Sequence, residues 1–127
     1  KPFLNGSTLL DDAYNANPVG CIEAVNVLGQ FEGFKKIIVT PGLVELGDKE
    51  YEYNYNLGLA AAETCDVIIL VGEQRAIPMK KAAEDKNFGG ELHIVESFAA
   101  AMDILRGICT RETAVLIEND LPDNYLN

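Results

Sequence analysis

Basic residues are scarce in this chain of 127 residues. Lysine and arginine together number 10, against 20 aspartates and glutamates, so the formal net charge is -10 at pH 7. The only adjacent basic pairs are Lys35-Lys36 and Lys80-Lys81. Nucleic acids and anionic membranes are bound through clusters of lysine and arginine that meet their phosphates. The composition therefore argues against both partners, and a phosphate ligand would need backbone N–H groups, a metal ion or another domain.

Cysteine and long apolar runs are also scarce. The 3 cysteines, Cys21, Cys65 and Cys109, form no C-x-x-C pair, which indicates buried, reduced thiols. No apolar run approaches membrane-spanning length, and we find no signal-peptide pattern, so we expect a cytoplasmic protein. Because the first residue is Lys1 and not Met, we also expect a processed or excised piece of a longer chain.

The familiar motifs of nucleotide binding and catalysis are absent. No G-x-G-x-x-G is present, and the glycines at Gly42 and Gly47 have P-loop spacing but no following lysine. This chain therefore cannot hold a triphosphate by itself in the P-loop manner. The single histidine, His93, lies in an apolar strand pattern without a cysteine or histidine partner, and we interpret it as structural. No serine or cysteine has a well-placed histidine, so we predict no catalytic residue and no metal ligand.

Apolar residues are plentiful, at 48%, and their pattern predicts the fold. Apolar runs predict strands at 7–12, 35–40, 66–72, 92–96 and 113–118, with helices between them. This order is typical of an α/β fold with an open, doubly wound, Rossmann-like sheet, mostly parallel, with helices on both faces. We predict one domain over residues 1–127. Asn5-Gly6 is a hairpin signal, so an antiparallel N-terminal strand could precede the parallel ones.

Two helices need separate arguments. Asn17 and Pro18 suit the N-cap and first positions of a helix. Four aliphatic residues that recur every three positions then predict its buried face: Val19, Ile22, Val25 and Leu28. Further on, tyrosines alternate with polar residues as in a strand: Tyr51, Tyr53 and Tyr55. A crossover between parallel strands requires a helix, so we predict one here as well.

Ligands of such sheets bind at the carboxyl ends of the strands. Four polar stretches follow strands there: "DDAYNANP" (11–18), "TPGLVELG" (40–47), "GEQRA" (72–76) and "ENDLPDN" (118–124). In the third stretch, Arg75 falls in the first turn of a predicted helix. It suits either a bound carboxylate or phosphate, or a surface salt bridge.

The paired acids Asp11 and Asp12 have two interpretations. Either one acid or Asn15 caps the following helix while the other acid is solvated, or an acid binds a ribose hydroxyl or a metal ion. Adjacent acids after a first strand also occur in phospho-receiver domains, but those need an aspartate at the end of a central strand. Here the central strands end at Thr40 and Gly72, so we exclude that class.

The string "DDAYNANP" resembles the signature that opens the C-terminal domain of the Mur ligases, in the version of the members that add D-alanyl-D-alanine. "ELG" at 45–47 and "VG" at 71–72 are similar too, and the resemblance covers essentially the whole chain. It implies an ATP-dependent ligase of peptidoglycan precursor synthesis. ATP and Mg²⁺ would activate the carboxylate of a UDP-MurNAc-peptide as an acyl phosphate, which the amine of D-Ala-D-Ala then attacks. The P-loop and metal ligands would belong to a missing central domain, with an N-terminal domain before it.

The resemblance also assigns residues. Asp12 matches the acid near the ATP ribose, and Asp11 is a weaker candidate. The other nucleotide-binding predictions are listed by position: Tyr14, Asn15 and Asn17. We predict substrate contacts at Glu45, Asn119 and Asp120. One departure stands out, because "ENDLPDN" replaces the K-G-S-R-like loop of many relatives and removes its positive charge.

Two hypotheses follow. In the first, the chain is the C-terminal domain of such a ligase and is inactive alone. A variant of this hypothesis is a related Mur or folylpolyglutamate-type ligase that acts on another amine. The second is a non-catalytic acidic binding module of the same fold, and the altered loop after Glu118 motivates it. An upstream P-loop would favour the ligase, and a start codon at Lys1 would favour the module.

Overall fold

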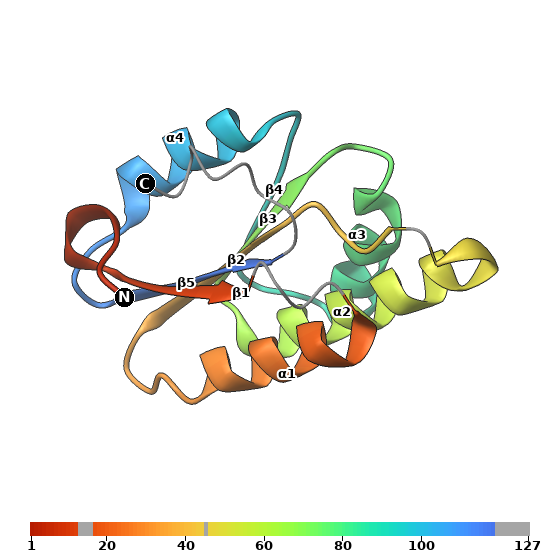
Figure 1. Cartoon of the computed structure of the whole chain (residues 1–127), viewed down its shortest axis with the longest axis horizontal. Coiled ribbons are helices and arrows are strands. Elements are labelled where there is room, and N and C mark those ends of the chain that lie inside the picture. The colour runs from red at the N-terminus through yellow and green to blue at the C-terminus, as the bar shows by residue number, and fades with distance from the viewer. Residues whose placement is uncertain (13–16, 45, 119–127) are drawn as a thin grey trace.

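A computed structural model describes residues 1–12, 17–44 and 46–118, and for Asp11 and Asp12 it describes the backbone alone (Figure 1). The strands and helices predicted from the sequence are all present. They are β1 (Thr8–Asp12), α1 (Pro18–Gly29), β2 (Lys35–Thr40), α2 (Glu50–Thr64), β3 (Val67–Val71), α3 (Ala76–Asp85), β4 (Glu91–Val95), α4 (Phe98–Ile108) and β5 (Thr113–Glu118). None of the helices in these described ranges is long and apolar enough to cross a membrane.

The five strands form one parallel sheet in the order β1-β5-β2-β3-β4. From β1 to β4 the chain moves across the sheet in one direction, and from β4 to β5 it returns. Because crossovers between parallel strands are right-handed, a reversal of direction places the next helix on the opposite face. Accordingly α1, α2 and α3 pack on one face, while α4 covers the other (Figure 1). The predicted doubly wound fold is confirmed.

Alternating strand residues build a core on each face of the sheet. In β2, Ile38 contributes to the cluster with α1, α2 and α3, whereas Ile37 and Val39 contribute to the cluster with α4. All three side chains are fully buried. Coverage of both faces explains why the central strands appear in the sequence as continuous aliphatic runs.

The N-terminal segment does not form the suggested strand. Asn5 and Gly6 have φ angles of 56° and 83°, and the Ser7 N–H donates to the Leu4 carbonyl at 3.0 Å. The segment before this turn forms an isolated antiparallel bridge between Pro2 and Thr8, and Lys1 exchanges backbone hydrogen bonds with Leu9 of β1. The Asn5 side chain instead donates to backbone carbonyls beyond the sheet edge, at Arg106 and Cys109. The turn is therefore held by the end of α4 rather than by a longer strand.

The predicted buried face of α1 is wrong at its first residue. Val25 and Leu28 are fully buried, but Val19 is 69% exposed. A helix turns about 100° per residue, so residues nine positions apart point in opposite directions. A stripe that recurs every three residues from Val19 to Leu28 cannot stay on one face. Cys21, which is seven positions before Leu28, takes the buried place.

Helices α2 and α3 approach closely at Gly58. A Cβ atom at this position would lie 2.8 Å from the Ala82 Cβ and 2.9 Å from the Met79 Cα. The tyrosine-rich segment before Gly58 is helical, as the crossover argument predicted. The glycine therefore sets the distance between the two helices that line one side of the carboxyl edge.

We expect Gly58→Ala to lower the free energy of unfolding by about 1–2 kcal/mol. Overpacking costs about 1–3 kcal/mol, and the higher helix propensity of alanine returns up to about 1 kcal/mol. Gly107 in α4 is a matched control, because a Cβ there meets nothing within 4 Å. Urea denaturation should show Gly107→Ala to be neutral or stabilising, and equal effects at both positions would contradict the packing argument.

All three cysteines are buried and unbridged, as predicted. Burial raises the pKa of the Cys65 thiol to about 12, and the neighbouring Asp66 carboxylate adds to the shift. Burial also raises the pKa of Cys109. Both thiols are therefore protonated at neutral pH and do not supply a nucleophile.

Candidate functional site at the carboxyl edge of the sheet

The polar stretches predicted to share one edge of the sheet begin side by side. At this edge, Asp12 at the end of β1 is paired with Glu118 at the end of β5, and Thr40 at the end of β2 is paired with Leu70 in β3. Glu118 is fully buried. The strand register therefore brings the "DDAYNANP" corner next to the start of "ENDLPDN".

Asn17 caps α1. Its Oδ1 accepts a hydrogen bond from the Gly20 N–H at 2.7 Å, and Pro18 occupies the first helical position. The sequence prediction of this helix start is confirmed. Because the side-chain oxygen is engaged in the cap, a ligand contact from Asn17 would come from its amide nitrogen or its backbone.

The other predicted site residues are described in part or not at all. Asp11 and Asp12 occupy the last two positions of β1, paired with Ile117 and Glu118. The remaining predictions lie outside the described residues: Tyr14, Asn15, Glu45, Asn119 and Asp120. Their roles stay predictions.

The segment that leaves β2 is fixed by hydrogen bonds. The Thr40 Oγ1 accepts from the Gly42 N–H at 3.0 Å, and Gly42 has a left-handed φ of 85°. The buried side chain of Asn54, in α2, then binds the backbone of Leu43 through both its oxygen and its nitrogen. The chain is thereby held against the first turns of α2 as it passes over the edge of the sheet.

A cavity of about 500 Å³ lies between the first turns of α2 and α3. Its walls combine apolar, amide and charged side chains, some exposed and some buried. They are Glu50, Tyr51, Asn54, Gln74, Arg75, Ile77 and Pro78. Of these residues, only Arg75 was considered from the sequence as a ligand contact. The lining residues come from two helices, and no short motif encodes how those helices approach each other.

Arg75 provides the positive charge of this cavity. Its side chain is exposed at the N-cap of α3, and it makes no ion pair with any residue in the described ranges. Several other cations are paired, as Arg106 is with Asp103 at 2.7 Å and Lys81 with Asp85 at 3.0 Å. The surface salt bridge considered from the sequence is thus not formed within the described part of the chain. An exposed guanidinium beside a helix N-terminus suits a bound carboxylate or phosphate.

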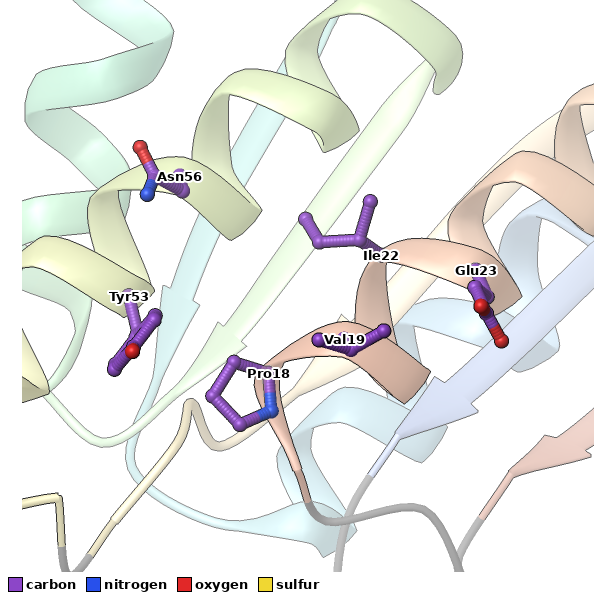
Figure 2. Close-up of a pocket in the computed structure, with 6 residues that line it drawn as sticks. All are labelled: Pro18, Val19, Ile22, Glu23, Tyr53 and Asn56. Carbon is purple, nitrogen blue, oxygen red and sulfur yellow. The ribbon is translucent and has the colours of Figure 1, made fainter.

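A second, smaller hollow of about 280 Å³ separates the first turns of α1 and α2 (Figure 2). Pro18, Val19 and Ile22 face Tyr53 and Asn56 across it (Figure 2). Among the described residues that line it, Glu23 alone is charged, and a carboxylate does not suit a phosphate. The exposed Val19, misplaced in the sequence prediction, belongs to this apolar hollow.

The described residues do not form a metal site. No group of three or more histidine, cysteine, aspartate or glutamate side chains within the described ranges is arranged to hold an ion.

A doubly wound α/β domain with a capped helix and a cavity lined by Arg75 and Glu50 at one carboxyl edge has the architecture in which ligands bind at strand ends. A family model described as "Mur ligase, glutamate ligase domain" matches residues 2–118, so the chain belongs to the Mur ligase family. The search of curated proteins gave no match. Mur ligases are ATP-dependent ligases, so the chain belongs to an enzyme family with a role in peptidoglycan precursor synthesis.

Proposed function

We propose that this chain is the C-terminal domain of a cytoplasmic, ATP-dependent amide ligase that adds D-Ala-D-Ala to a UDP-MurNAc-tripeptide, the MurF type. The observation that carries the proposal is the location of the "DDAYNANP" string. Its acids end β1 and its Asn17-Pro18 begins α1, at the edge where α/β sheets bind ligands. Family membership over residues 2–118 supports the same reaction class.

The ligation needs an activated carboxylate and a positioned amine. A carboxylate oxygen of the peptide attacks the γ-phosphorus of ATP, and ADP leaves. The amine then attacks the acyl carbon, phosphate departs and the amine loses a proton. On this chain, Asp12 would bind the ribose, with Asp11, Tyr14, Asn15 and Asn17 along the nucleotide. Mg²⁺, which neutralises the phosphates when bound, and the P-loop would be supplied by the central domain.

The cavity between α2 and α3 suits the amine-bearing substrate. D-Ala-D-Ala carries one carboxylate, which Arg75 would bind, and one ammonium group, which must lose a proton before it attacks. Tyr51 and Ile77, which are 55% and 60% exposed, offer apolar surface for the two methyl groups. We therefore add the residues of this cavity to the substrate contacts predicted from the sequence, which are Glu45, Asn119 and Asp120.

The function is tested by a substrate panel with the full-length ligase. ATP, Mg²⁺ and UDP-MurNAc-tripeptide are supplied with D-Ala-D-Ala, L-glutamate or meso-diaminopimelate, and ADP release is measured. We expect release to depend on D-Ala-D-Ala. Dependence on another amine would support the related-ligase variant, and absent turnover would support the non-catalytic module that the altered loop after Glu118 suggests.

A further inference from the structure

Asn54 is a polar residue in a place that the fold otherwise gives to apolar side chains. It is 1% exposed, between the fully buried core of α2 and the segment that leaves β2. Its Oδ1 accepts from the Leu43 N–H at 2.7 Å. Its Nδ2 donates to the Leu43 carbonyl and to the Glu50 carbonyl, each at 2.9 Å. The side-chain amide thus uses its oxygen and both N–H groups.

This hydrogen-bond pattern requires both a donor and an acceptor. By binding both backbone groups of Leu43, Asn54 takes the place that a neighbouring strand would take. Leucine at this position would fill a similar volume but leave the buried N–H and C=O groups of Leu43 without this partner. Aspartate would keep the acceptor but place a carboxylate beside two carbonyl oxygens. A buried donor or acceptor that loses its partner lowers the free energy of unfolding by about 1–3 kcal/mol.

The same side chain lies close to Arg75 and the cavity between α2 and α3. Gly42, which precedes Leu43, would bring a Cβ atom to 3.0 Å from the Asn54 Oδ1 and to 3.5 Å from the Arg75 Cβ. Gly42 is therefore the spacer between the Asn54 amide and the base of Arg75. Asn54 also lines the cavity between α2 and α3. Leu43 and Gly42 thus connect the Asn54 side chain to the start of α3.

We propose that Asn54 is a positioning residue, which holds the β2–α2 segment so that Arg75 presents its guanidinium to the carboxylate of the amine-bearing substrate. The inference rests on the proposed function of the cavity. Asn54 itself binds backbone and does not touch the reacting atoms. Its removal should therefore affect the amine substrate more than ATP, which binds at the β1–α1 corner.

The test compares Asn54→Leu and Asn54→Asp in the full-length ligase. We expect Asn54→Leu to raise the KM for D-Ala-D-Ala about ten-fold or more and to leave the KM for ATP within about two-fold, because the two buried hydrogen bonds that hold the Leu43 backbone are lost. Asn54→Asp, which keeps the acceptor but loses both donors to the carbonyl oxygens, should also raise the KM for D-Ala-D-Ala and leave the KM for ATP within about two-fold. In hydrogen exchange, the Leu43 amide of Asn54→Leu should exchange about ten-fold faster than in the wild type.

Leu105→Ala is the matched control. Leu105 is fully buried in the cluster on the opposite face of the sheet, so its truncation lowers stability without contacting the β2–α2 segment. It should leave both KM values and the exchange of the Leu43 amide unchanged. If Asn54→Leu does not fold, Asn54→Asp carries the test.

Equal changes in both KM values, or no change in either, would overturn the positioning role. A wild-type ligase that does not turn over D-Ala-D-Ala would instead contradict the proposed function. In that case the exchange of the Leu43 amide still decides whether Asn54 holds this segment.

Discussion

Arg75→Gln is expected to raise the KM for D-Ala-D-Ala about ten- to hundred-fold while the KM for ATP stays within about two-fold. A hydrogen bond to a charged group is worth about 1.5–3 kcal/mol, and about 1.4 kcal/mol corresponds to a ten-fold change in binding. Glutamine keeps a donor at the mouth of the cavity but removes the charge. The side chain makes no ion pair with the described residues, so the substitution disrupts no salt bridge there.

A dipeptide analogue with an amidated C-terminus sharpens this experiment. The wild-type ligase should discriminate against the analogue, because it lacks the carboxylate that Arg75 binds, whereas Arg75→Gln should use both forms with similar KM. Arg106→Gln is the control, since Arg106 lies on α4 and is paired with Asp103 at 2.7 Å. Equal discrimination by wild type and Arg75→Gln would show that the carboxylate binds elsewhere.

Asp12→Ala in the full-length ligase is expected to lower kcat/KM for ATP about ten- to hundred-fold. A hydrogen bond from a ribose hydroxyl to a charged carboxylate contributes about 1.5–3 kcal/mol to the binding free energy. Asp11→Ala should have the smaller effect, because Asp11 is the weaker match to the family acid. Both residues are the last of β1, so both variants change the same short segment.

Deoxyribose analogues of ATP identify the contact. Removal of a ribose hydroxyl should weaken the wild type and leave Asp12→Ala unaffected, because the partner of that hydroxyl is already gone. Wild-type turnover in Asp12→Ala would remove the role assigned to this acid. The isolated chain should bind ATP weakly or not at all, and sub-micromolar binding would contradict a site shared between domains.

Local sequence signals were enough for most of the fold. Aliphatic runs located the five strands, and Asn17-Pro18 located the start of α1, because caps and buried strands are encoded over a few neighbouring residues. The tyrosine alternation in α2 was resolved only by topology, since parallel strands need a crossover helix. The three-residue repeat predicted Val19 to be buried, but the helix has 3.6 residues per turn, so Val19 is exposed.

The cavity could not be predicted in the same way. Its walls come from the first turns of α2 and α3, and their separation depends on the close approach at Gly58. Asn54 appeared in the sequence as one polar residue of an amphipathic helix. Its function as a backbone partner for Leu43 depends on a contact across 11 residues of chain. The location of "DDAYNANP", by contrast, was predictable, because it depends only on where the first strand ends.

Oxygen transfer from the substrate carboxylate to phosphate tests the central claim, that this chain belongs to a ligase that works through an acyl phosphate. UDP-MurNAc-tripeptide with a heavy oxygen isotope in its terminal carboxylate is incubated with the full-length ligase, ATP, Mg²⁺ and D-Ala-D-Ala. Each amide formed should release one phosphate that carries one labelled oxygen, together with ADP. Unlabelled phosphate, or AMP in place of ADP, would contradict this mechanism.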